Sequence, residues 1–363
     1  MQFDFIVIGA GIAGLSAAAA LSVHGKVALL EREDQPCHHS SGRSAAIFVR
    51  SYGNAAVQAL TDISGRLFAA ESAAGDAALG RRRGVMIVAR RDGDPGAAAP
   101  GQRRLSAAEA AARMPLLQAG LLSHAWLEED AADIDVHAMH MAYARTLRAN
   151  GGLLLTGFGV EAAARTAGVW QVSDGIRTLV APVVVNAAGA WADAVGQLFG
   201  AAPKGIRPLR RSAALVDPPA GSRIDEWPMV IDVEESVYFK PDAGKLMVSP
   251  ADQSLSVPCD AWADDMDIAI AIERYSELTG MEVQRVTHSW AGLRSFVADE
   301  SPLIGWDSDS PGLLWLAALG GFGVQTAPAT GALAAALARG SAPLEGATAC
   351  LLRAVDPARV IVG

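Results

Sequence analysis

The sequence has few cysteines, few aromatic residues and no long uninterrupted apolar run. Its three cysteines, Cys37, Cys259 and Cys350, form neither a CxxC pair nor a spaced set of metal ligands. Structural zinc and a disulfide framework are therefore not expected. Sparse cysteine suits a reducing compartment, so the cytoplasm is the expected location, with peripheral association to the inner membrane left open.

Positive charge is also in short supply. Lys and Arg total 30 against 39 Asp and Glu, a net charge of −9, which argues against nucleic acid or an anionic membrane as partner. No stretch reaches the roughly 18 uncharged apolar residues of a membrane span, so no transmembrane segment is expected. The apolar opening has no basic leader, and residues 3–8 are interpreted as a β-strand rather than a signal peptide.

Hydrophobic residues make up 51% of the 363 positions, and this length predicts about two domains at ~150 residues each. Residues 3–8, a helix to about residue 22 and a strand at 27–30 form a β-α-β unit. Ser106 and Glu109 have the spacing of a helix capping box. Further elements are expected as strands at 84–89 and 282–290, helices at 136–149 and 266–279, and a strand, glycine turn and helix at 313–339.

A glycine fingerprint, Gly9-Ala10-Gly11-Ile12-Ala13-Gly14, lies between the first strand and helix. Such glycines permit a tight turn, close approach of a pyrophosphate and close helix–strand packing, and the helix amides favour the diphosphate. Glu31 ends the second strand, where an acid can accept hydrogen bonds from a ribose hydroxyl. The alternative is a packed turn with Glu31 as an ordinary charge. The residues assigned here to a dinucleotide are Gly9, Gly11, Ile12, Ala13, Gly14 and Glu31.

Two further segments favour FAD over NAD. The hydroxyl-rich segment 40–44 surrounds one arginine and can wrap an anion, although a solvated loop is the alternative. The glycine turn at 320–323 precedes a helix and can direct amides at a reduced flavin, although an ordinary β-α turn is the alternative. Together they indicate a long cofactor touched from both chain ends. They contribute Ser41, Gly42, Arg43, Ser44, Gly320, Gly321, Phe322, Gly323, Val324, Gln325 and Thr326.

The sequence resembles the D-amino-acid oxidase superfamily of flavoproteins, and within it the D-arginine dehydrogenase-like enzymes. The resemblance is carried from end to end by IVIGAGIAG (6–14), LLERE (29–33), HHSSGRSAA (38–46), ADID (132–135), VVNAAGAW (184–191), RRSAALV (210–216), WPM (227–229), YFKPDAG (238–244), SPA (249–251), HSWAGLRSFVAD (288–299) and GGFGVQT (320–326). It implies a mixed α/β fold with a discontinuous Rossmann-type domain for non-covalent FAD and an inserted substrate domain on an antiparallel-rich sheet. The expected boundaries are 1–80, 136–205 and 295–363 for the FAD domain, and 81–135 and 206–294 for the substrate domain. Further implied FAD contacts are Arg32, Ala46, Val160, Ala188, Gly189, Trp191 and Arg294.

The same resemblance implies oxidation of an amino acid at its α-carbon, by hydride transfer to flavin N5. The imino acid product is then hydrolysed to a 2-oxo acid and ammonia. Arg211 and Arg294 match the arginines that hold the substrate carboxylate, Tyr52 and Tyr238 match tyrosines beside it, and the Gly321 carbonyl matches the acceptor for the substrate amine.

These residue types suit that chemistry independently. A planar guanidinium makes paired charge-assisted hydrogen bonds to a carboxylate, and a tyrosine adds a hydroxyl donor on an apolar wall. Positioning then supplies much of the catalysis, while the cofactor carries the redox chemistry. The plainer alternative for each arginine is a structural ion pair, and for Tyr238 ordinary packing.

The sequence departs from the D-arginine type at two positions. Ile47 stands where those enzymes carry a histidine, and Gly84 stands roughly where they carry an acid. Neither residue can pair a substrate guanidinium, so neutral, apolar D-amino acids are expected instead. A contrary option is that Arg82 or Arg83 turns inward and selects an acidic side chain. The candidate wall residues are Ile47, Phe48, Val49 and Met86.

Other functions on the same fold remain open. An enzyme for N-methyl amino acids or 2-hydroxy acids would need the same carboxylate clamp. A flavin-binding redox sensor or complex subunit would need no turnover. The acceptor that reoxidises the flavin, quinone or oxygen, is undecided. His137 and His140 lie at helical spacing without a suitable acid, so no metal is expected.

Overall fold

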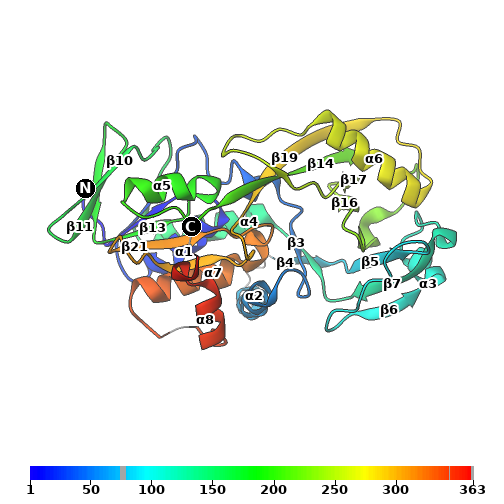
Figure 1. Ribbon diagram of the computed structural model, residues 1–363, viewed down its shortest axis with the longest axis horizontal. Helices are drawn as coiled ribbons and strands as arrows, with labels where there is room; N and C mark the ends of the chain where they lie inside the picture. Colours follow the sequence, from blue (N-terminus) through cyan, green and yellow to red (C-terminus); the bar gives the residue numbers. More distant parts are fainter. Residues whose placement is uncertain (74–78, 343, 361–363) are drawn as a thin grey trace.

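Two large sheets dominate the fold, and a long strand pair of the second sheet extends toward the first (Figure 1). The computed structural model describes residues 1–73, 79–342 and 344–360. The first sheet has the strand order β20-β21-β13-β1-β2-β9, parallel except for β20. Its strands are β1 (Phe5–Ile8), β2 (Val27–Leu30), β9 (Leu153–Leu155), β13 (Val183–Asn186), β20 (Leu303–Trp306) and β21 (Leu313–Ala317).

Alternating side chains of β1 bury both faces of this sheet. Phe5 and Val7 pack with helices, whereas Ile6 and Ile8 pack toward a small antiparallel sheet. Burial on both faces is typical of a parallel sheet in an α/β protein. The helical face is covered by α1 (Ile12–Ser22), α4 (Val136–Ala149), α7 (Gly323–Ala338) and α8 (Ala349–Val355). The opposite face is covered by β10 (Ala162–Thr166), β11 (Val169–Ser173), β12 (Thr178–Ala181) and α5 (Ala192–Leu198).

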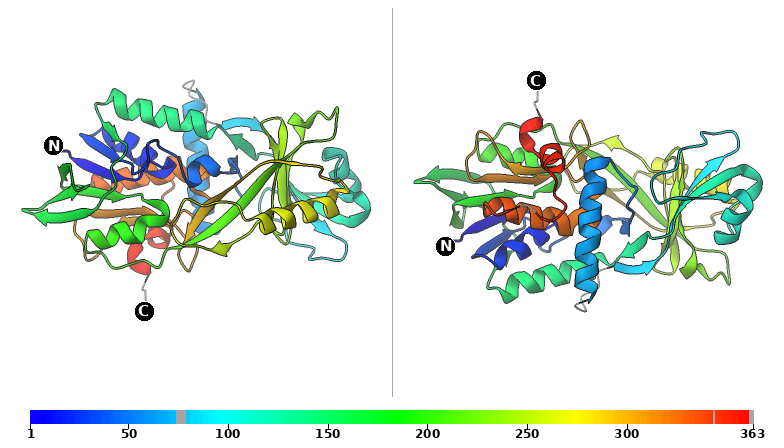
Figure 2. Two further views of the ribbon diagram at one scale, coloured as in Figure 1. Left: turned by 90° about the horizontal axis from the view of Figure 1, so that it is seen from above. Right: turned by 90° about the horizontal axis from the view of Figure 1, so that it is seen from below.

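The second sheet forms the other end of the molecule (Figures 1 and 2). One of its faces packs on two helices through Met86, Phe239 and Tyr275, and the other carries Val85 and Tyr238. Its nine strands are β5 (Val85–Arg90), β6 (Arg103–Ser106), β7 (Leu122–Glu128), β14 (Arg207–Val216), β15 (Met229–Asp232), β16 (Tyr238–Asp242), β17 (Lys245–Ser249), β18 (Ser254–Leu255) and β19 (Val286–Phe296). The helices are α3 (Ala107–Arg113) and α6 (Asp265–Thr279).

A small sheet, β3 (Ile47–Phe48), β8 (Ala132–Ile134) and β4 (Leu79–Arg82), lies near the junction beside α2 (Ala55–Ala73). Asp133 on β8 binds two cations from neighbouring segments. Arg83 Nε donates to Asp133 Oδ2 at 2.8 Å, and Lys240 Nζ donates to Oδ1 at 3.1 Å. Both cationic side chains are almost fully buried, so this ion cluster joins the small sheet to the nine-stranded sheet.

The mixed α/β class is confirmed, as are the helix at 136–149 and the Ser106–Glu109 capping box. The strand expected at 282–290 begins later and runs through Phe296, because it pairs along β14 for almost its whole length. All three thiols are free. Across the described ranges, no helix is both long and apolar enough to cross a membrane.

Candidate active site

A cavity of about 600 Å³ lies between the two sheets. It runs from the glycine turn after β1, past the segment at 40–54, to the open face of the nine-stranded sheet. The turn between β21 and α7 forms another side. Segments from both chain ends therefore meet around one space.

The glycine turn has the geometry expected of a dinucleotide fingerprint. Gly9 has φ +97°, and a Cβ on Gly14 would lie 1.9 Å from the Gly9 carbonyl oxygen, so a side chain is excluded there. A Cβ on Gly11 would meet only the Ser41 hydroxyl, at 3.3 Å, because Gly11 faces the cavity. The Glu31 carboxylate accepts hydrogen bonds from the amides of Ala10 and Glu33. It is thereby fixed beside the turn, and its contact with a ribose stays a prediction.

The segment at 40–46 lines the cavity, but its arginine is engaged elsewhere. Arg43 Nη1 donates to the carbonyl oxygens of Ala261 and Ala291, and Nη2 binds Asp260. The guanidinium thus ties this segment to the other sheet, and binding a cofactor phosphate would require it to leave those partners. The Ser41 hydroxyl accepts from the Ile12 amide at 3.0 Å, which holds the segment against the start of α1.

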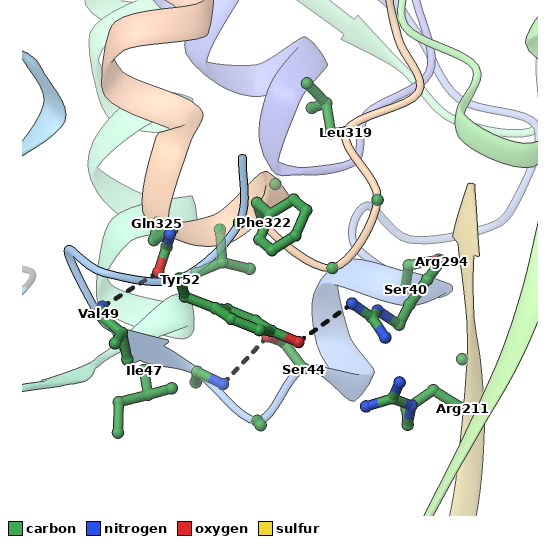
Figure 3. Close-up of a pocket in the computed structure, with 18 of the residues that line it drawn as sticks. Ser40, Ser44, Ile47, Val49, Tyr52, Arg211, Arg294, Leu319, Phe322 and Gln325 are labelled. Atoms are coloured by element: carbon green, nitrogen blue, oxygen red, sulfur yellow. Dashed lines mark hydrogen bonds between the residues drawn. The ribbon is translucent and has the colours of Figure 1, made fainter. Parts of the chain in front are cut away.

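The two predicted carboxylate ligands lie on the long strand pair. Arg211 of β14 faces Gly292, and Arg294 of β19 faces Leu209. Residues opposite each other in an antiparallel pair share a face, and diagonal neighbours are about 7–8 Å apart. Both guanidinium groups therefore point from the same face into the cavity, side by side (Figure 3).

Each guanidinium is held on one side and free on the other. Arg211 Nε donates to the Asp252 carbonyl oxygen at 2.7 Å, and Arg294 Nη2 donates to the Tyr52 hydroxyl at 3.3 Å. Arg211 Nη2 and Arg294 Nη1 are buried and find no hydrogen-bond partner within the described part of the chain. A buried donor without a partner is costly, and two such cationic donors in one cavity suit an anion.

The two predicted tyrosines complete this corner. Tyr52 packs edge-on against Phe322, with ring centroids 4.9 Å apart. Tyr238 of β16 places its ring 5.8 Å from the Arg211 guanidinium carbon. Both tyrosines line the cavity, and the Tyr52 hydroxyl lies beside the Arg294 guanidinium.

The turn before α7 is shaped by the arginine beside it. Gly320 has φ +55°, and its amide donates to the Ser295 carbonyl of β19 at 2.8 Å. A Cβ on Gly321 would lie 2.3 Å from Arg294 Nε, so glycine leaves room for the guanidinium. The residues that begin α7 line the cavity, and the unpaired amides of a helix start can bind an anion.

Two side chains assigned to the cofactor from this segment are already engaged. The Gln325 side chain accepts from the Val49 amide and donates to Thr61, and the Thr326 hydroxyl donates to the Phe322 carbonyl. Their side chains therefore fix the turn and the neighbouring segment. Any cofactor contact here would come mainly from the backbone.

Only half of the predicted substrate wall lines the cavity. Ile47 and Val49 do, whereas Phe48 packs against Phe68 and Met86 lies fully buried against α3 and α6. The reason is strand alternation, which sends neighbouring side chains to opposite faces. The wall residues that the sequence analysis missed are Val85, Ile87, Ala213, Met229, Ile231 and Met247. Val85 and Ile87 lie on the same face of the sheet as Tyr238. Sequence alone could identify them only if the register of the strands were already known.

Neither Arg82 nor Arg83 turns into the cavity. Arg82 binds Asp130 at the surface, and Arg83 is committed to Asp133 and to the Trp227 carbonyl. The option that one of them selects an acidic substrate side chain is therefore not supported.

Of the remaining predicted cofactor contacts, only some border the cavity. Gly189 lines the cavity, next to Ala188 at the start of a short 3-10 turn. Trp191 ends this turn and carries the Arg32 guanidinium 4.8 Å above its ring. Val160 is half-buried against the sheet core, while Gly42 packs on the Cys37 carbonyl. Their contacts with a cofactor stay predictions.

A glycine turn with the dinucleotide fingerprint and two arginines with unpartnered donors line one cavity, an arrangement that suits a dinucleotide cofactor and an anionic substrate. Residues 4–337 match the family model described as DAO, FAD dependent oxidoreductase. The chain belongs to this family and is an FAD-dependent oxidoreductase. Gly11 lines the cavity at the start of α1, where a Cβ would meet only the Ser41 hydroxyl, and this open approach to the helix amides fits the pyrophosphate of FAD.

Solved structures share the whole fold. A glycine oxidase from Geobacillus kaustophilus is 19% identical, with a TM-score of 0.81, over 99% of this chain and all of that one. An L-proline dehydrogenase from P. horikoshii is 19% identical, with a TM-score of 0.84, over 99% and 97% of the two chains. An L-α-glycerophosphate oxidase from Mycoplasma pneumoniae, solved with FAD bound, is 17% identical, with a TM-score of 0.83, over 95% and 99%.

Proposed function

We propose that this enzyme oxidises D-amino acids with neutral, apolar side chains, as a variant of the D-arginine dehydrogenase-like enzymes. The products are the 2-oxo acid and ammonia, formed by hydrolysis of the imino acid. The observation that carries the proposal is the pair of buried guanidinium nitrogens, Arg211 Nη2 and Arg294 Nη1, that lack a partner among the described residues. An α-carboxylate would satisfy both.

The protein's own contribution is to bind and orient. The two guanidinium groups would take the carboxylate, with the Tyr52 and Tyr238 hydroxyls as further donors. The backbone carbonyl of Gly321 would accept from the substrate amine, which fixes the α-carbon between two anchors. FAD, when bound, supplies the acceptor for the two electrons and the α-hydrogen. No side chain need act as base if the substrate amine is already neutral.

The apolar wall supports the proposed side-chain preference. Val85, Ile87, Met229 and Ile231 come from two neighbouring parallel strands in direct register, Met229 beside Val85 and Ile231 beside Ile87. With Ile47 they form a continuous apolar surface, and burying a charged side chain against it would be costly. The preference for the D-configuration is supported by the resemblance in the sequence and is tested below.

The test is anaerobic mixing of the purified yellow holoenzyme with single D- and L-amino acids, followed by flavin absorbance. Bleaching by D-leucine, D-methionine and D-phenylalanine, with little by their L-forms or by D-arginine, is expected. Faster bleaching by D-arginine would refute the departure from the D-arginine type. No bleaching by any amino acid would remove this assignment and favour N-methyl amino acids, 2-hydroxy acids or a non-catalytic flavoprotein.

A further inference from the structure

The segment that carries Tyr52 is held by side chains of α2 and α7. The Val49 amide donates to Gln325 Oε1 at 3.1 Å. Gln58 Nε2 donates to the carbonyl oxygens of Ser51 and Gly53 at 3.0 and 2.9 Å. The segment at 49–54 joins β3 to α2 without regular structure of its own, so these contacts decide where the Tyr52 hydroxyl lies.

A buried acid outside the cavity also holds this segment. Glu128 ends β7 opposite Val85, and its side chain is only 4% exposed. Its Oε1 accepts from the Arg50 amide at 2.7 Å, and its Oε2 accepts from the Ser51 amide at 3.3 Å. The Arg50 guanidinium binds Asp62 instead. Both carboxylate oxygens of Glu128 therefore bind backbone amides directly before Tyr52.

We propose that Glu128 is a positioning residue for the carboxylate clamp, and this rests on the proposed function. Glu128 fixes the Arg50 and Ser51 amides, which sets the Tyr52 hydroxyl 3.3 Å from Arg294 Nη2. Tyr52 in turn holds the Arg294 guanidinium beside Arg211 (Figure 3), with Arg294 Nη1 left without a partner among the described residues. Glu128 contacts neither substrate nor cofactor, and its effect passes through Tyr52.

The chemistry of two adjacent amides explains why an acid is needed here. A carboxylate accepts at both oxygens, whereas a glutamine of the same shape accepts at one and presents a donor at the other. Glu128→Gln would therefore place an NH₂ group against an amide N–H. The segment would have to shift to relieve this, while the near-isosteric side chain keeps the packing of β7.

The first measurement is propionate binding to the holoenzyme, followed by the visible absorption of the bound flavin. Propionate has the carboxylate but no amine. Glu128→Gln should weaken it about tenfold, the scale of one charge-assisted hydrogen bond. Glu129→Gln is the matched control, since this neighbouring side chain is 55% exposed and binds Arg103 and Arg113 at the surface. An unchanged Kd in Glu128→Gln would overturn the proposal.

A double-mutant cycle with Tyr52→Phe separates positioning from a general loss of structure. If Glu128 acts through the tyrosine hydroxyl, the effect of Glu128→Gln should largely disappear in the Tyr52→Phe background. Glu128→Asp, which keeps both acceptors, should recover part of the affinity. An effect of the same size with and without the tyrosine hydroxyl would contradict the proposal.

Amide hydrogen exchange gives a readout that needs no ligand. Residues 49–54 should exchange faster in Glu128→Gln than in the parent or in Glu129→Gln, with the rest of the chain unchanged. No perturbation of the parent flavin by propionate at any concentration would count against the carboxylate clamp and so against the proposed function. Unchanged exchange at 49–54 in Glu128→Gln would instead overturn the positioning role, so the two failures are distinguishable.

Discussion

At the scale of single residues, the site depends on two arginines that the fold leaves partly unsatisfied. Strand pairing puts Arg211 and Arg294 on one face. Gly292, opposite Arg211, lets Ser40 and Arg43 lie close to the sheet. The neighbouring Arg210 points the other way and binds Asp267 of α6 at 2.7 Å. Adjacent arginines of identical chemistry thus have different surroundings because of strand alternation.

Replacement of either clamp arginine by lysine should weaken catalysis strongly. Lysine keeps the charge but lacks the planar fork that matches a carboxylate. We expect Arg211→Lys or Arg294→Lys to lower kcat/KM by about 100-fold, or roughly 3 kcal/mol. Steady-state kinetics with D-leucine and a dye acceptor would check this. Arg82→Lys, at an exposed pair with Asp130, is the control and should change little.

Gly321 offers a steric test of the same clamp. A Cβ there would overlap Arg294 Nε at 2.3 Å, and a guanidinium can move aside where backbone cannot. Gly321→Ala should therefore retain FAD and its melting temperature within a few degrees, yet lose carboxylate binding. Gly120→Ala, where a Cβ meets nothing within 4 Å, is the control. Normal propionate binding by Gly321→Ala would count against the arrangement of this turn.

At the scale of elements, local motifs were predictable and strand faces were not. The glycine fingerprint, the capping box and the helix at 136–149 depend on neighbouring residues, so sequence alone located them. The face of β5 depends on its parallel pairing with β15, some 140 residues away. For this reason Met86 was assigned to the substrate wall, whereas Val85 and Ile87 form it.

Truncation of two neighbouring residues of β5 should have different effects, one on stability and the other on substrate preference. Met86→Ala removes a fully buried side chain and should lower the free energy of unfolding by about 2–5 kcal/mol. Ile87→Ala instead enlarges the cavity and should shift kcat/KM by about tenfold from D-leucine toward D-phenylalanine. Denaturant unfolding and kinetics on both substrates would separate these effects. Equal loss of stability in the two variants would contradict the assigned strand face.

At the scale of the whole molecule, long-range contacts set roles that no local pattern reports. Arg43 was expected at the cofactor, but its guanidinium bridges to Ala261 and Ala291 on the other side of the cavity. The small sheet is likewise joined to the nine-stranded sheet by Asp133, Arg83 and Lys240. These partners are 50 to more than 200 residues apart, so pairing could not be read from the sequence.

The ion cluster of Asp133, Arg83 and Lys240 should make the stability of the fold depend on pH in the acidic range. Burial alone would raise the pKa of Asp133, but the hydrogen bond from Arg83 and the charge of Lys240 hold it below the ordinary 3.8. A depressed folded pKa gives stability that is complete above the unfolded value and lost as pH falls through the folded one.

Asp133→Asn should lower the free energy of unfolding by about 3 kcal/mol at neutral pH, because two buried cations lose their partner. Its stability should also fall less steeply below about pH 4. Asp130→Asn, at an exposed pair, should stay within about 0.5 kcal/mol of the parent. Denaturant unfolding across pH checks both points. If the free energy of unfolding of Asp133→Asn falls at low pH as steeply as that of the parent, this role is refuted.

The most direct test of the account compares an amino acid with the same molecule lacking its carboxylate. Anaerobic stopped-flow mixing of the holoenzyme with D-leucine or with 3-methylbutylamine would follow flavin reduction in each case. The account predicts rapid reduction by D-leucine and reduction at least about 1000-fold slower by the amine, since two guanidinium groups would be left unpaired. Comparable rates would contradict the carboxylate clamp and, with it, the proposed substrate class.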